Sequence, residues 1–116
     1  MIEIDEVEKM LEEIAADLPR EFYKELNGGI LLLPQAKQKR TERKRDLYTM
    51  GEYHVSGSMG RYIVIYYGSF EQLYGNMDRE SLKRQLAHTL KHEFTHHLES
   101  LAGERELEKE DEKFLR

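Results

Sequence analysis

Apolar residues recur at helical spacing near both ends of the chain and gather into short runs between them. Over residues 5–18 they stand three or four positions apart, which predicts an amphipathic helix capped by Asp5 and closed by Pro19. Pro19 can open a second short helix, which Gly28 and Gly29 end. The N-terminal part of the chain is therefore expected to supply two helices.

Three short apolar runs in the middle of the chain predict strands. Residues 30–33 are too few for a helix and end at Pro34. Residues 47–55 form a second run, and residues 62–67 form a third in which every side chain is β-branched or aromatic. Because glycine and serine dominate residues 56–60, we expect the second and third strands to form a hairpin.

A long helix is predicted over residues 79–102, with Asp78 as its cap and Gly103 as its end. At about 100° per residue, one face of this helix collects the apolar side chains. They are Leu82, Leu86, Leu90, Phe94, Leu98 and Leu101. The order of elements predicts an α+β fold, in which a short mixed sheet with a β-hairpin packs against the N-terminal helices and the long C-terminal helix.

Length and composition limit what kind of protein this is. The chain has 116 residues, which predicts a single domain over residues 1–116 with one modest core and a shallow site. It has no apolar stretch near the roughly 18 residues of a membrane span and no signal-peptide pattern, so a cytoplasmic protein without membrane association is expected. It also has no cysteine, which leaves histidine and carboxylate side chains to bind a metal.

Charge argues against nucleic acid as the main partner, because the formal net charge is −5. Basic residues nevertheless gather in residues 37–45, where six positive charges face the single Glu42. We interpret this run as a solvated loop, and contact with an acidic partner or a phosphate backbone is the alternative. The run contains no aromatic residue that could stack on a base.

The segment His92 to His96 reads H-E-x-x-H and lies inside the long predicted helix. Histidines four positions apart project one above the other, so both imidazoles can reach a single ion. In zinc peptidases with this pattern the intervening glutamate, here Glu93, acts on a bound water. An ordinary solvated helix face is the alternative, since His92 and His96 lie opposite the apolar face.

Three neighbouring residues are weaker candidates for the same site. His88 extends the stripe, but three ligands at i, i+4 and i+8 spread too far for one ion, so we expect a surface residue. His97 falls on the core side and is expected to be packed and hydrogen-bonded. Glu99 is close enough to His96 to orient its imidazole, with direct metal binding as the alternative.

These motifs resemble those of the small bacterial zincin-like metallopeptidase family, whose members are sometimes described as minimal zincins. The similarity extends over residues 18–23, 26–30, 51–53, 59–63, 65–70 and 92–105. The resemblance implies an active-site helix packed on a small mixed sheet. It also implies one zinc ion bound by His92 and His96, with Glu93 as the general base.

The chain departs from the family pattern after His96. That pattern continues H-E-x-x-H-x-x-G-x-x-D, whereas Glu99 stands here at the glycine position and Ala102 at the aspartate position. Glu104, directly after Gly103, is the predicted third metal ligand. The alternatives are Glu99, Glu106, Glu108 and Asp111, and residues 104–112 also read as a solvated charge run.

The resemblance predicts zinc-dependent hydrolysis of peptides or unfolded proteins, in which Glu93 moves the proton from water to the leaving amine. An extended peptide is expected to pair with an exposed sheet edge, for which the strand over residues 62–67 is the candidate. Tyr66 or Tyr67 could donate to the developing oxyanion, although core packing is the main role expected for both. A catalytically inactive, zincin-derived module that binds metal or peptide is the alternative. An adaptor that uses the basic run ranks third.

Overall fold

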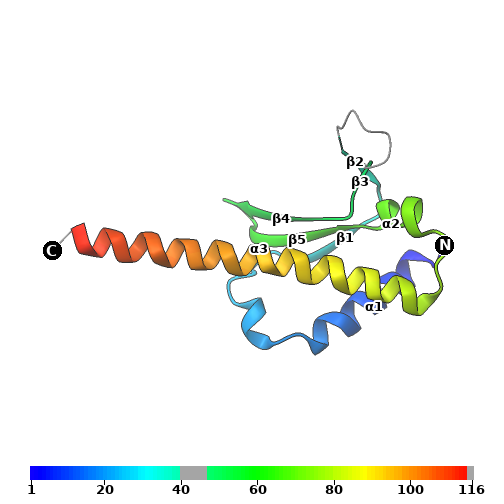
Figure 1. Cartoon of the computed structure of the whole chain (residues 1–116), viewed down its shortest axis with the longest axis horizontal. Helices are drawn as coiled ribbons and strands as arrows, with labels where there is room; N and C mark the ends of the chain where they lie inside the picture. The colour runs from blue at the N-terminus through cyan, green and yellow to red at the C-terminus, as the bar shows by residue number, and fades with distance from the viewer. Residues whose placement is uncertain (40–46, 115–116) are drawn as a thin grey trace.

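The long helix α3 (Arg79–Phe114) carries the other elements along its N-terminal part, while its C-terminal part projects beyond them (Figure 1). The computed structural model describes residues 1–39 and 47–114. Most of the basic run over residues 37–45 therefore lies outside the described residues. None of the helices described is long and apolar enough to cross a membrane.

A three-stranded mixed sheet lies against α3. Its order is β1 (Gly29–Leu33), β5 (Gly60–Tyr66) and β4 (Gly51–Ser56), with β5 parallel to β1 and antiparallel to β4. This arrangement confirms the predicted α+β fold with its mixed sheet and hairpin. The central position of β5 shows that the choice of this strand as the exposed edge was wrong. The edge strands are β1 and β4.

A second, two-stranded sheet pairs β2 (Lys37–Gln38) with β3 (Tyr48–Thr49). The single strand predicted over residues 47–55 is therefore two strands separated at Met50, because β3 pairs with β2 whereas β4 pairs with β5. The sequence does not reveal this break, because both segments have strand-forming composition.

The shorter helices differ from prediction mainly at their ends. Helix α1 (Ile4–Asp17) begins after Glu3, so Asp5 lies in its first turn rather than at its cap. A negative charge is also favourable there, next to the unpaired amides of the helix N-terminus. After Pro19 the chain forms the 3-10 helix η1 (Arg20–Tyr23), and α2 (Tyr67–Tyr74) follows β5 directly.

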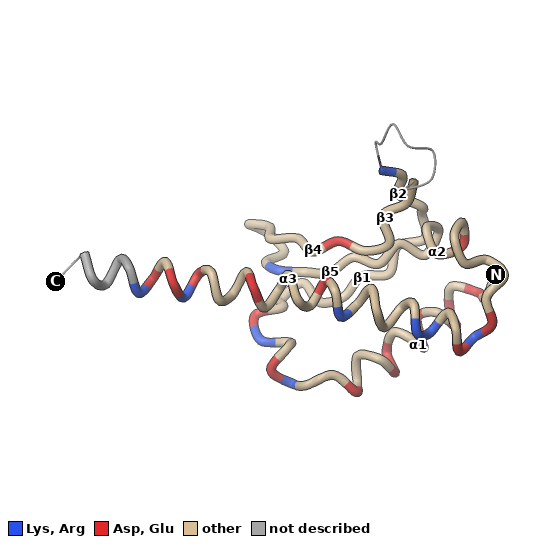
Figure 2. Tube along the Cα trace, in the orientation of Figure 1, with Lys and Arg blue, Asp and Glu red and all other residues tan. Residues whose placement is uncertain are grey.

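Helix α3 does not stop at Gly103, which corrects the predicted end of this helix. Gly103 lacks the positive φ of a glycine that ends a helix, and a Cβ placed on it would meet nothing within 4 Å. The residues that follow are mostly glutamate, arginine, leucine and lysine, all strong helix formers. The projecting part carries charges of both signs (Figure 2), and its described side chains over residues 102–109 are exposed.

One hydrophobic core joins α1, β5 and α3. Its fully buried side chains include Val7 and Met10 of α1, Ile63 and Ile65 of β5, and Leu82, Leu86, Leu90 and Phe94 of α3. Leu98 was predicted to belong to this face but is 36% exposed. The core fixes the rotation of α3 about its axis, which directs the opposite stripe of the helix toward solvent.

Candidate functional site

His92 and His96 lie one turn apart on the exposed side of α3. Their Nε2 atoms are 3.2 Å apart. Two nitrogen ligands at about 2.0–2.1 Å from a tetrahedral zinc ion are separated by about 3.3 Å. The distance between the two histidine nitrogens is therefore close to the separation of two ligands on one zinc ion.

Glu93 lies between these histidines in sequence, but its side chain is buried and only 6% exposed. It packs where α3 meets β4, since its Cγ lies 3.3 Å from the place that a Cβ on Gly51 would occupy. Burial raises the pKa of Glu93, while the nearby imidazoles of His92 and His96 lower it. A carboxylate held in this way accepts a proton more readily than one in water.

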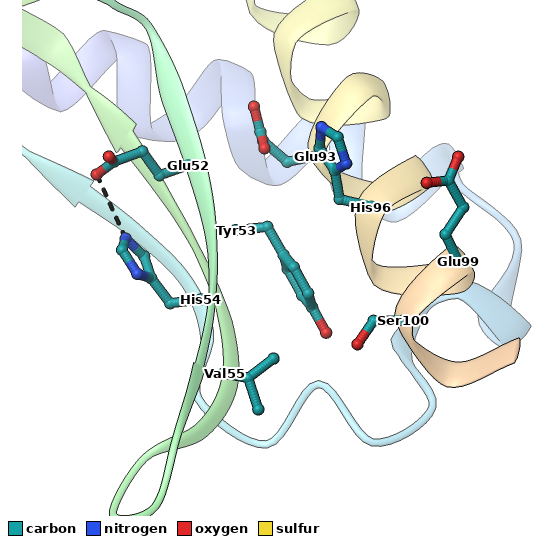
Figure 3. A pocket seen from close by; sticks show the side chains of 8 residues that line it. All are labelled: Glu52, Tyr53, His54, Val55, Glu93, His96, Glu99 and Ser100. Carbon is teal, nitrogen blue, oxygen red and sulfur yellow. Dashed lines mark hydrogen bonds and ion pairs between the residues drawn. The ribbon is translucent and has the colours of Figure 1, made fainter. Parts of the chain in front are cut away.

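Two hollows flank Glu93 along the boundary between β4 and α3, and together they form a shallow groove. The first has a volume of about 640 Å³, and Figure 3 shows its lining side chains, Glu52, Tyr53, His54, Val55, Glu93, His96, Glu99 and Ser100. The second has a volume of about 340 Å³ and includes Thr89, His92 and Glu93 among its lining. Because both hollows contain Glu93, this residue stands at the middle of the groove.

The predicted third ligand, Glu104, is not brought to the histidine pair. Since α3 continues past Gly103, Glu104 stays on the helix, and its Oε1 forms an ion pair with Arg61 Nη2 at 2.5 Å. Among the side chains described, over residues 1–39 and 47–109, no three from histidine, aspartate or glutamate form a group that could hold a metal ion. Within those residues, His92 and His96 supply two of the three or four protein ligands that a zinc site uses.

The alternative ligands, Glu99, Glu106, Glu108 and Asp111, all follow His96 on α3. Glu99 is exposed and lies in the first hollow with His96. The Oε1 atom of Glu106 lies 4.0 Å from the Nζ atom of Lys109 on the projecting part of α3. Glu108 lies on the same part of the helix and is exposed. The side chain of Asp111 lies outside the described residues. None of the described alternatives joins the histidine pair in a three-residue group.

His97 is packed and hydrogen-bonded, as predicted, and it joins β4 to α3. Its Nε2 is 2.8 Å from the carbonyl oxygen of Lys24, which can only accept, so Nε2 carries the proton. Nδ1 then accepts from the hydroxyl of Tyr53 at 2.8 Å, and Tyr53 accepts in turn from Arg61 Nη1 at 3.0 Å. We call Tyr53, Arg61 and His97 the clamp, because they fix the distance between strand and helix.

The two tyrosines proposed as oxyanion donors are engaged elsewhere. Tyr66 donates its hydroxyl to Glu52, and burial together with this bond raises the pKa of Tyr66 to about 12. Tyr67 donates to the carbonyl oxygen of Ile2 at 2.7 Å. Neither hydroxyl lines the hollows beside Glu93.

Sequence reasoning missed the clamp residues Tyr53 and Arg61. Arg61 is only 7% exposed, which is unusual for an arginine and marks a residue with a structural task. Its partner Tyr53 lies across the hairpin on β4, and its partner Ser100 lies 39 positions away on α3. A strand position occupied by arginine was the one available signal, and it does not identify these partners.

Comparisons with known proteins identify a family and a similar structure. Residues 43–112 match the family model of zincin-like metallopeptidases. A conserved hypothetical protein from Thermus thermophilus has a similar structure, with a TM-score of 0.67 and 31% sequence identity. That match covers 83% of this chain and 94% of the other. No curated protein matches the chain.

Proposed function

Because this chain belongs to the zincin-like metallopeptidase family, we propose that it is a zinc-dependent peptidase that cleaves extended peptides or unfolded proteins. One observation carries the proposal: two exposed imidazoles at metal-sharing distance stand beside a buried glutamate. An ordinary solvated helix face gives no reason to bury Glu93 against a strand.

His92 and His96 would hold the zinc ion. When bound, the ion polarises a peptide carbonyl and makes water more acidic. We assign no third protein ligand, because the described part of the chain offers no such side chain beside the pair. This gap is the observation that favours the second candidate function, a zincin-derived module that binds metal or peptide without turnover.

Glu93 would act as the general base. Its carboxylate takes a proton from the attacking water and delivers it to the leaving amine. Burial supports this role, because it raises the pKa of Glu93 and so strengthens the base. The position of Glu93 at the middle of the groove puts the proton acceptor beside any peptide that lies along it.

The free edge of β4 is the proposed binding site for the peptide backbone. The amide of Tyr66 donates to the carbonyl oxygen of Met50 at 3.0 Å. Hydrogen-bonded residues alternate along an antiparallel pair, so the backbone groups of Gly51, Tyr53 and Val55 point away from β5. An extended peptide can pair with these groups as an additional strand beside Glu93.

The test combines metal analysis with a cleavage assay. Protein supplied with zinc should hold it in the wild type and in Glu93→Gln. Cleavage of an unfolded protein should fall by about 10²- to 10⁴-fold in Glu93→Gln, because the general base is lost. Glu71→Gln on α2, which exchanges an exposed carboxylate away from the groove, should cleave as the wild type does.

Two results would contradict the proposal. Bound zinc without Glu93-dependent cleavage would exclude the peptidase and leave the binding module. No bound zinc, even after zinc is supplied, would exclude both and leave a helix that carries two histidines on its surface.

A further inference from the structure

Gly51 is the point at which β4 comes closest to the active-site face of α3. A Cβ on this residue would lie 2.9 Å from Thr89 Cγ2, 3.2 Å from the carbonyl oxygen of Val64 and 3.3 Å from Glu93 Cγ. The first distance is shorter than real Cβ contacts. Gly51 does not have a positive φ, so close approach, and not backbone conformation, is the reason that glycine is needed here.

The strand cannot move away to make room for a larger residue. Two residues along β4, Tyr53 is tied to α3 through its bond to His97. On its other side β4 is paired along its length with β5. A side chain at position 51 would therefore be accommodated by displacing Thr89 or Glu93.

Gly51 also carries backbone groups that point to the free edge of β4, where the peptide is proposed to bind. The same residue thus touches the side chain of the proposed base and forms part of the proposed binding edge. Its missing side chain determines how far apart these two features lie.

We propose that Gly51 is a positioning residue, which sets the distance between the Glu93 carboxylate and a peptide bound along β4. This inference rests on the proposed peptidase function. Gly51 acts through Glu93 and does not itself take part in proton transfer. It has no contact with His92 or His96 through a side chain, so zinc binding should not depend on it.

The test is the variant Gly51→Ala in the zinc-loaded full chain, with cleavage of an unfolded protein as the assay. A displacement of the base by about 1 Å can reduce catalysis by about 10²-fold, so we expect kcat to fall by about 10- to 100-fold. KM and zinc affinity should stay within about threefold, because the strand edge and the histidine pair are retained.

Thr89→Ser provides the rescue, because it removes the Cγ2 atom that a Cβ at position 51 would meet. The double variant Gly51→Ala, Thr89→Ser should recover part of the kcat that Gly51→Ala loses. Gly57→Ala is the matched control, since its new Cβ would meet nothing within 4 Å in the hairpin turn.

The results separate this inference from the proposed function. A wild-type chain without Glu93-dependent cleavage overturns the proposed function itself. An active wild type with unchanged kcat in Gly51→Ala, or a loss that Thr89→Ser does not recover, overturns the positioning role. If Gly51→Ala does not fold alone, kcat is measured in the double variant with Thr89→Ser, in which the new Cβ still lies 3.3 Å from Glu93 Cγ, and a wild-type kcat there overturns the proposal.

Discussion

Glu93 shows at the residue scale how burial and neighbouring charge act on one side chain. Burial raises its pKa by disfavouring the ionised form, and the imidazoles of His92 and His96 partly offset that effect. In the metal-free protein the folded state therefore holds the Glu93 proton more tightly than the unfolded chain does. Ionisation of Glu93 consequently lowers the free energy of unfolding.

We expect Glu93→Gln to change the dependence of stability on pH in the metal-free protein. The contribution of Glu93 to the free energy of unfolding is fully present below the ordinary pKa of 4.5. It is lost as the pH rises through the raised pKa of Glu93 in the folded state. At pH 8 the variant should be more stable than the wild type, and the difference should close toward pH 4.5.

Urea unfolding at several pH values measures this difference, with Glu71→Gln as the control for loss of an exposed carboxylate. A Glu93→Gln variant that is less stable than the wild type at pH 8 would show that the ionised carboxylate is stabilised by its surroundings.

At the residue scale, the candidate roles of the two histidines and the glutamate could be predicted from the sequence, because they depend on a local pattern. His92, Glu93 and His96 need only the regular turn of one helix to be arranged. The roles of Gly51 and Tyr53 could not be predicted from the sequence. They depend on contacts with residues of α3 that lie about 40 positions away in the chain. The ion pair of Glu104 with Arg61 is hidden from the sequence for a related reason, because Arg61 lies on β5.

At the element scale, the decisive feature is the continuity of α3. A glycine commonly ends a helix by adopting a left-handed conformation, and Gly103 does not do so. We therefore expect Gly103→Ala to raise stability by about 0.5–1 kcal/mol, because alanine loses less conformational freedom in a helix. Thermal unfolding followed by circular dichroism measures the effect.

Gly60→Ala is the matched control for this prediction. Gly60 has a φ of 71°, so a Cβ at this position is strained, and the variant should lose stability. A loss of stability in Gly103→Ala as well would indicate that the helix ends at Gly103 in solution.

The sheet shows where prediction of elements reaches its limit. Composition and turn residues predicted all three strands and the hairpin, because those signals are local. The order of the strands depends on which edge the parallel strand β1 joins, and no local pattern specifies that choice. This is why the exposed edge was first assigned to β5, whereas the structure places β5 at the centre of the sheet and β4 at its edge.

At the scale of the whole molecule, zinc binding should appear as a gain in global stability. A ligand that binds only the folded state stabilises it, by about 2.7 kcal/mol when its free concentration is 100-fold above Kd. We therefore expect zinc to raise the Tm of the wild type in a concentration-dependent way. Differential scanning calorimetry with and without a chelator measures the shift.

The histidine variants make this prediction specific. His92→Ala should abolish the zinc-dependent shift, because one imidazole of the pair is lost. His88→Ala should retain it, although His88 lines the neighbouring hollow on the same helix. An equal shift in His92→Ala would place the zinc somewhere other than the histidine pair.

The open edge of β4 also has a consequence for how copies of the chain associate. An unpaired edge usually invites another sheet to join it, which is a route to aggregation. The groove between β4 and α3 opens on the face of this strand from which the Tyr53 and Val55 side chains point (Figure 3). A single extended chain added to the edge would cover the unpaired backbone groups of β4. A peptide bound as proposed would therefore also protect this edge from pairing with another copy of the chain.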